Sequence, residues 1–404
     1  MTLTMGFGAY GASVMNTQMM IDWQLDRKSL GLAIGSFALT MGLVSPLAGV
    51  FVHRWGARTA LSLGTLAMAL GALAMATVVN SLVSLVLVYG LVMGWGAAMG
   101  SAIPAQTVVS YWFKKRLAMA LTLTVMGSNL GGFIAAPLLA KVITASDGNW
   151  RMGWFVVAAA CAIAFCCAVL FVRNKPSDIG QLQDGGEKSH DESEVKAGSP
   201  PTSSVYKTTR DWEFAEVVRH PASWWMIIGA VCSGAALGIV IGHGVAHFID
   251  LGHSPEVAAS FLGTVVGTGL GGRILFAVLG DRIEPRFVLS ASLFLMALGM
   301  LLVIDATSVI ELYASATLLG VGSALPMLCM AAMAINYFGQ TAFSRFVGLA
   351  GLFMALTPAI LVVVTGIVFD RMGSYTLVFY SATAAFILLG LVMPFVRPPA
   401  LASR

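Results

Sequence analysis

Twelve long apolar runs, separated by short charged or turn-rich segments, constrain this chain more than any other feature. Most are long enough to cross the ~30 Å hydrocarbon core of a bilayer as a helix rising about 1.5 Å per residue. Charged residues make up only 10% of the 404, far below the roughly 25% of soluble domains. The sequence therefore predicts an all-α integral membrane protein with twelve transmembrane helices. We place the runs near 2–21, 29–51, 59–79, 82–111, 118–142, 151–172, 223–249, 257–280, 287–304, 309–336, 343–369 and 374–396.

The runs fall into two groups of six around a hydrophilic linker. This predicts an N-terminal bundle over 1–172, a cytosolic linker over 173–222 and a C-terminal bundle over 223–404. The middle of the linker, 181–204, is rich in Gly, Ser, Pro and charged residues and is expected to be disordered. Its end, 211–220 (DWEFAEVVRH), has apolar residues at helical spacing and predicts a short helix at the inner membrane surface.

The distribution of Lys and Arg predicts the orientation. With both termini in the cytosol, inner segments and the linker hold seventeen of these residues, whereas the outer loops hold five. Cytosolic segments carry this excess by the positive-inside rule. We therefore expect a multi-pass protein of the plasma (inner) membrane with both termini in the cytosol. No basic segment or cleavage site precedes the first run, so we expect no secretory signal.

Several classes of function find no support in the sequence. All five cysteines lie in apolar runs, so we expect packing residues and no metal site or disulfide set. The Gly-x-x-Gly patterns follow no predicted strand, so they do not indicate a dinucleotide-binding site. No P-loop, catalytic triad or zinc-protease motif occurs. We therefore expect no enzyme activity, no cofactor and no nucleic-acid partner, with the bilayer as the surroundings of most of the chain.

A charged residue inside a predicted span is the strongest functional signal. Arg273 lies midway along 261–280 (FLGTVVGTGLGGRILFAVLG), a run without Asp or Glu. Placing a guanidinium at the bilayer centre costs roughly 2.5–3.5 kcal/mol on insertion scales, so such residues face a partner or a water-filled cavity. Arg273 is therefore a candidate site for an anion. The alternative is a structural arginine that snorkels or bonds to backbone carbonyls.

Two short segments show an internal repeat. His53, Arg54 and Arg58 follow the second run, and Asp281, Arg282 and Arg286 follow the eighth. The arginines of the two copies are 228 residues apart. Two parallel six-helix repeats are typical of transporters, which bind substrate between the halves.

These segments resemble the inner-loop motif G-x-x-x-D-R-x-G-R-R of the major facilitator superfamily. Within it, the chain is most similar to the monocarboxylate transporter branch and its bacterial oxalate/formate antiporter-like relatives. The matching stretches are 111–118 (YWFKKRLA), 126–131 (MGSNLG), 243–252 (HGVAHFIDLG), 272–273 (GR) and 280–282 (GDR). The resemblance implies twelve helices in two six-helix bundles, a central cavity and a monomer. It also implies that His53, Arg54, Arg58, Asp281, Arg282 and Arg286 form an inner gate.

Three positions depart from these relatives. The acidic residue of the first loop is His53 here. Gly269 stands where animal monocarboxylate carriers place an Asp one turn before the arginine, and the first run lacks their lysine, so their proton relay does not carry over. Met354 matches the second basic residue of the oxalate-type exchangers. A single cavity cation suits one carboxylate better than two.

Other polar residues lie on spans that the resemblance places at or near the cavity. His243 is a candidate for substrate binding and proton coupling, because imidazole titrates near pH 6.5. His247, one turn away, fits an ordinary hydrogen-bonded residue better. Asn129, Gln106 and Tyr10 are candidate substrate-binding residues in the cavity. Asn129 could instead bridge helices, and Tyr10 could simply pack.

The sequence thus predicts a secondary active transporter of a small monocarboxylate, working by alternating access with a proton or in exchange. Arg273 would pair with the carboxylate of this small organic anion. The alternatives are an efflux carrier for bulkier amphipathic anions or drugs, and a transporter-like membrane sensor whose linker signals to a partner.

Overall fold

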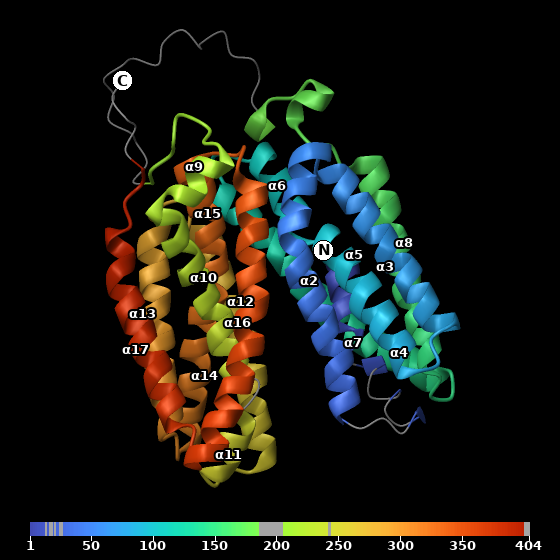
Figure 1. The fold of residues 1–404 in the computed structure, drawn as a ribbon, viewed down its shortest axis with the longest axis vertical. Coiled ribbons are helices and arrows are strands. Elements are labelled where there is room, and N and C mark those ends of the chain that lie inside the picture. Colours follow the sequence, from blue (N-terminus) through green and yellow to red (C-terminus); the bar gives the residue numbers. More distant parts are fainter. Residues whose placement is uncertain are drawn as a thin grey trace. The chain divides into compact units, whose positions relative to one another are not determined.

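The computed structural model describes residues 1–399 apart from 13, 16–18, 20–21, 24–26, 186–204 and 241–243. The described residues form helices and connecting segments, with no strand (Figure 1). Eleven of their helices are long and apolar enough to cross a membrane. The expected first span, 2–21, is described only in part, with helix η1 at Thr2–Tyr10. The prediction of an all-α multi-pass membrane protein is confirmed.

The chain forms two compact units. The first comprises Met1–Lys114, Leu123–Ser189 and Ser344–Ala355, and the second comprises Lys115–Thr122, His190–Phe343 and Leu356–Arg404. The helices α7 and α16 each contribute residues to both units. The disorder expected for 181–204 concerns a stretch that lies mostly outside the described residues.

The first unit contains the helices that precede the linker. They are η1, α2 (Arg27–Trp55), α3 (Ala57–Thr77), α4 (Leu82–Leu85), η2 (Val86–Met93), α5 (Gly94–Met99), α6 (Ala102–Trp112), most of α7 (Leu117–Ala145) and α8 (Trp150–Phe171). Trp154, Met68 and Met75 are fully buried in its core. Small residues allow close helix contact there. A Cβ on Gly6 would lie 2.4 Å from the Cα of Gly131, so η1 packs directly on the backbone of α7.

The second unit contains the helices after the linker. They are α9 (Phe214–Arg219), α10 (Pro221–Ile239), α11 (Val245–Asp250), α12 (Pro255–Leu279), α13 (Pro285–Ile304), α14 (Val309–Ala324), α15 (Pro326–Phe338), most of α16 (Phe343–Met372), α17 (Thr376–Val392) and η6 (Met393–Phe395). The helix α12 packs on α14 through its glycines, since a Cβ on Gly272 would lie 3.1 Å from the Cα of Val321. The short helix α9 lies within the stretch 211–220 that was expected to be helical.

The fourth span of each half is interrupted at an equivalent place. In Leu82–Trp112 the break falls at Gly100 and Ser101, where Ser101 has φ −133° and ψ −114°. In Val309–Phe338 it falls at Leu325, just before Pro326. Proline and glycine are the usual causes of sharp helix kinks. Ser101 and Pro326 are 225 residues apart, the same spacing as Trp112 and Tyr337 at the ends of the two spans, so the internal repeat extends to the backbone.

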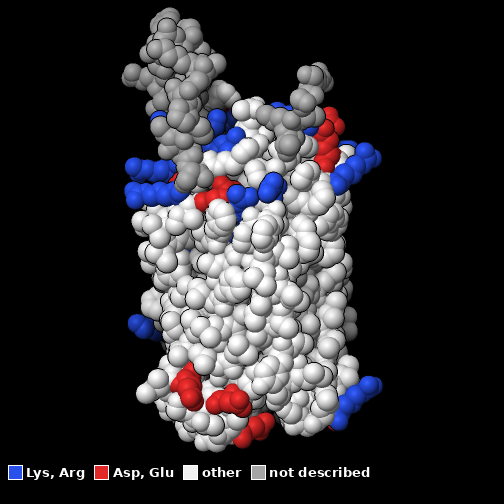
Figure 2. Space-filling view, turned by 90° about the vertical axis from the view of Figure 1, so that its left-hand side faces the viewer, with Lys and Arg blue, Asp and Glu red and all other residues white. Residues whose placement is uncertain are grey.

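Most charged side chains of the described residues lie near the ends of the membrane-spanning helices, and Arg273 is an exception. On the face shown in Figure 2, most Lys, Arg, Asp and Glu gather toward the two ends, and the band between them is almost entirely uncharged. An uncharged band of this kind matches the hydrocarbon core of a bilayer, because charge there is costly.

Candidate functional site

Arg273 lies in the second half of α12 and is partly buried. The buried face of this helix includes Phe261, Val265, Gly269 and Phe276. At about 100° per residue, Arg273 lies roughly 80° from the centre of that face, at its edge. The guanidinium therefore leaves the helix beside the contact with α14. The structure places the arginine inside a membrane-spanning segment (Ser260–Leu279), as the sequence indicated.

Gln106 is the most unusual polar residue of the first unit. It lies in α6 with no exposed surface, and neither its amide nitrogen nor its amide oxygen has a hydrogen-bond partner among the described residues. The neighbouring Thr107 and Ser110 satisfy their hydroxyls on backbone carbonyls one turn earlier. A buried polar group without a partner costs about 1–3 kcal/mol. The amide of Gln106 therefore has hydrogen-bonding capacity that no described residue satisfies.

Asn129 lies on α7 and is half-buried. The glycines on either side of it, Gly127 and Gly131, face Thr2 of η1. Two residues correspond to about 200° around a helix, so Asn129 lies on the side of α7 away from η1. It is thus not part of the glycine contact that joins these two helices.

The other expected site residues are described less fully. Tyr10 is the last residue of η1, and its side chain lies outside the described residues, as does the whole of His243. His247 is buried, and its Nε2 lies 2.9 Å from the carbonyl oxygen of Val303 at the end of α13. That contact fits the hydrogen-bonded alternative that the sequence left open for His247.

The first inner loop is a tight turn between α2 and α3. Gly56 has φ +84°, a conformation that favours glycine, and the side chain of Asn174 fills the space beside it. The backbone N–H of Arg58 donates to Oδ1 of Asn174 at 2.8 Å, and its guanidinium donates to the carbonyl oxygen of Val169 at the end of α8. His53 and Arg54 are exposed at the end of α2.

The second inner loop repeats this arrangement. The guanidinium of Arg286 donates to the carbonyl oxygen of Val396 at 3.3 Å, just after η6. Arg58 and Val169 are 111 residues apart, and Arg286 and Val396 are 110 apart. In each half, therefore, the last arginine of the motif binds a carbonyl at the end of the sixth span. This places a cation where a helix exposes its unsatisfied carbonyls.

Asp281 connects the second loop to the start of α7. Its two carboxylate oxygens accept the backbone N–H groups of Ala118 (2.9 Å) and Met119 (3.3 Å), all within the second unit. A carboxylate at this position caps the N-terminus of the helix and is attracted by the partial positive charge there. Arg282, the next residue, is exposed.

Glu284 is a buried carboxylate that the sequence reading missed. Its Oε1 accepts the hydroxyl of Tyr337 at 2.7 Å, and its Oε2 accepts the backbone N–H of Tyr206 at 2.9 Å. Only 6% of Glu284 is exposed, so it is held as a hydrogen-bonded acceptor between the loop, α15 and the linker. The one available signal was its place between Arg282 and Arg286 before a proline.

The end of the linker, residues 205–212, which we call the linker strap, packs against the C-terminal end of α15. Besides Tyr206, Thr208 donates its N–H to the carbonyl of Asn336 at 2.7 Å, and Trp212 donates to that of Phe338 at 2.9 Å. The strap therefore satisfies the free carbonyls at the end of α15.

Comparison with known proteins agrees with this architecture. The family model of the Major Facilitator Superfamily matches residues 1–285 and 245–404. Monocarboxylate transporter 14 of Mus musculus is 28% identical over 200 residues, which cover 46% of this chain and 38% of that protein. Monocarboxylate transporter 10 of Homo sapiens is 25% identical over 369 residues, covering 89% and 68% of the two chains. The chain thus spans well under half the length of the first relative.

Solved structures share the fold at low sequence identity. The E. coli fucose:proton symporter FucP has a TM-score of 0.72 and 16% identity, and the match covers 98% of each chain. The proton:xylose symporter XylE has a TM-score of 0.72 and 13% identity over 98% of this chain and 94% of that one. With its helical membrane spans and its matching family model, the chain belongs to the major facilitator superfamily and is related to the monocarboxylate transporter branch.

Proposed function

We propose that this transporter carries a small monocarboxylate across the membrane by alternating access. Arg273 supports this most directly, because it is partly buried inside a membrane-spanning helix whose apolar run contains no Asp or Glu. A guanidinium binds a carboxylate through two parallel hydrogen bonds, which adds direction to the charge attraction. Binding also neutralises the arginine and so lowers the cost of closing water out of the cavity.

Neutral donors would hold the remainder of the substrate. Gln106 is the best supported of them, because its amide is buried without a partner among the described residues. Asn129 is half-buried on the side of α7 away from η1. Tyr10 and His243 stay candidates on sequence grounds alone.

The two inner loops would act as the gate on the cytosolic side. Arg58 and Arg286 bind helix-end carbonyls, and Asp281 caps α7, so each loop ties one helix end to another. His53, Arg54 and Arg282 lie exposed beside these contacts. Breaking and remaking such bonds would accompany each transport cycle.

The coupling would be to a proton or to exchange. Gly269 does not titrate, so a carboxylate one turn before Arg273 is not available. His243 is the proposed coupling residue, or else the substrate brings its own proton. An imidazole near an arginine tends to stay neutral and to gain a proton once a carboxylate arrives. We place the protein in the plasma (inner) membrane with cytosolic termini, acting as a monomer.

A thermal-shift screen of the purified protein tests the proposal. Monocarboxylates should raise the melting temperature of the wild type, and Arg273→Ala should abolish this rise while leaving the unliganded protein folded. Arg273→Lys should weaken it strongly, because lysine keeps the charge and loses the planar fork. Arg371→Gln removes an exposed arginine and should leave the rise intact. An Arg273→Ala protein that binds with wild-type affinity would refute the proposal.

A further inference from the structure

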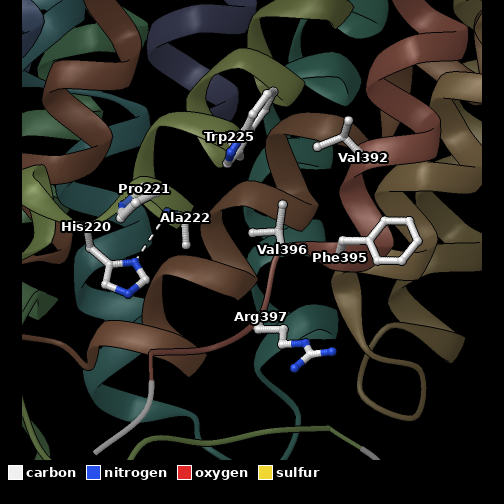
Figure 3. Close-up of a pocket in the computed structure, with 8 residues that line it drawn as sticks. All are labelled: His220, Pro221, Ala222, Trp225, Val392, Phe395, Val396 and Arg397. Carbon is white, nitrogen blue, oxygen red and sulfur yellow. Dashed lines mark hydrogen bonds between the residues drawn. The ribbon is translucent and has the colours of Figure 1, made fainter. Parts of the chain in front are cut away.

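A pocket of about 270 Å³ lies in the second unit, where α10 begins and α17 ends (Figure 3). It is separate from Arg273 and from every residue proposed above to bind substrate. Small-molecule pockets commonly measure about 300–1,000 Å³, so this one fits a headgroup better than a drug-sized ligand. Its lining residues are His220, Pro221, Ala222, Trp225, Val392, Phe395, Val396 and Arg397.

One side of the pocket offers hydrogen-bond donors. Nδ1 of His220 accepts the backbone N–H of Ala222 at 3.2 Å, and a backbone N–H only donates. Nδ1 therefore carries a lone pair, and the neutral ring has its proton on Nε2. Burial lowers the pKa of His220, which favours the neutral ring. Nε2–H is thus a donor that makes no hydrogen bond within the described part of the chain.

Arg397 supplies a positive charge to the lining of the pocket. It is exposed, and within the described residues its guanidinium makes no hydrogen bond or ion pair. The guanidinium of Arg286 donates a hydrogen bond to the carbonyl of Val396, the residue before Arg397. This brings a second arginine to the same stretch of chain. None of the eight lining residues is acidic. Figure 3 shows the His220 ring at the left of the view and the Arg397 guanidinium below and to its right, with Trp225 and Val392 above them.

The other side of the pocket is apolar and continues onto the lipid-facing surface of α17. Phe395 is 77% exposed, and Leu388 and Leu391, further up α17, are 63% and 55% exposed. Next to Trp225, Trp224 donates its indole N–H to the carbonyl of Val218 at 2.9 Å. Tryptophans with an apolar body and a bonded polar end are typical of the membrane–water interface.

We propose that this pocket binds the headgroup of an anionic membrane phospholipid. The phosphate would pair with the Arg397 guanidinium, the Nε2–H of His220 would be a further donor in the pocket wall, and the start of the acyl chains would lie over Trp225 and Phe395 toward α17. A free phosphate would leave the apolar side of the pocket in contact with water. A neutral lipid would leave the positive charge uncompensated. A basic surface attracts the anionic lipids of the cytosolic leaflet, so charge and location favour the same occupant.

The test uses the full chain purified in detergent and supplemented with phosphatidylglycerol, phosphatidylcholine or inorganic phosphate. Phosphatidylglycerol should raise the melting temperature, with little effect from the other two. Arg397→Gln should weaken the apparent affinity for phosphatidylglycerol about tenfold, through loss of a charge-assisted hydrogen bond. Trp225→Ala should weaken it through the apolar side. Arg116→Gln is the matched control, because it removes an exposed arginine that does not line the pocket.

Four results would overturn the proposal. Equal stabilisation by phosphatidylcholine would remove the role of charge, and equal stabilisation by inorganic phosphate would make the pocket a simple anion site. Unchanged affinity in both Arg397→Gln and Trp225→Ala would place the lipid elsewhere. A chain that binds phosphatidylglycerol only after residues 400–404 are removed would make that segment the natural occupant.

Discussion

Tyr337, at the end of α15, donates its hydroxyl to Oε1 of Glu284 at 2.7 Å, and both side chains are buried. The other carboxylate oxygen of Glu284 accepts the N–H of Tyr206. One carboxylate thereby joins the second inner loop, the fourth span of the second half and the linker strap. These are the parts of the second unit that would have to move together if the gate opens.

Removing either partner should loosen the strap. Tyr337→Phe leaves a buried carboxylate with one donor fewer, which costs about 1–3 kcal/mol. We expect a lower melting temperature and faster hydrogen exchange at the N–H of Tyr206, measured by exchange mass spectrometry. Glu284→Gln should produce the larger increase at Tyr206, because a neutral amide oxygen accepts more weakly than a carboxylate.

The N–H of Trp212 is an internal control for this measurement. It donates to the carbonyl of Phe338 and does not depend on Glu284. Its protection should stay close to that of the wild type in both variants. Equal loss of protection at both amides would show general unfolding of the strap and would contradict the specific role given to Glu284.

The carrier should prefer one carboxylate to two. A second carboxylate beside a single arginine would be desolvated without a counter-charge, which is costly. Matched pairs of acids, such as propionate and malonate, should therefore differ by at least tenfold in affinity in favour of the monocarboxylate. Tighter binding of oxalate or malonate would point to a second cation near the site.

Substitutions in the inner loops should change the transport rate far more than substrate affinity. Arg58→Ala and Arg286→Ala each remove a bond to a helix-end carbonyl, and Asp281→Asn weakens the cap on α7. Uptake into proteoliposomes should fall several-fold, with affinities within about twofold of the wild type. A large loss of affinity at normal turnover would assign these residues another role.

Proton coupling through His243 makes a separate prediction. Substrate-driven proton flux in proteoliposomes should be lost in His243→Gln, with substrate exchange retained, because glutamine keeps a donor and does not titrate. His247→Gln is the matched control, since His247 is bonded to Val303 in the folded protein. Wild-type flux in His243→Gln would exclude this residue, and a wild type without flux would identify a uniporter or an anion exchanger.

The sequence by itself determined the membrane architecture. Long apolar runs, the excess of Lys and Arg on one side and the 228-residue repeat are properties of composition and spacing along the chain. The bilayer enforces them, because every span must be apolar and must satisfy its own backbone hydrogen bonds. The position of Arg273 within a membrane-spanning helix follows from the same local reading.

Only the tertiary structure decided which polar groups meet. Glu284 reads as an ordinary loop carboxylate until Tyr337, 53 residues away, and Tyr206, 78 residues away, are brought to it. Asp281 caps a helix that begins more than 160 residues earlier. Gln106 reads as one polar residue among many until its complete burial leaves its amide without a partner among the described residues. Periodicity and charge fix which face of a helix is apolar, but hydrogen bonds depend on atoms being placed within about 3 Å, and that placement comes from packing between distant segments.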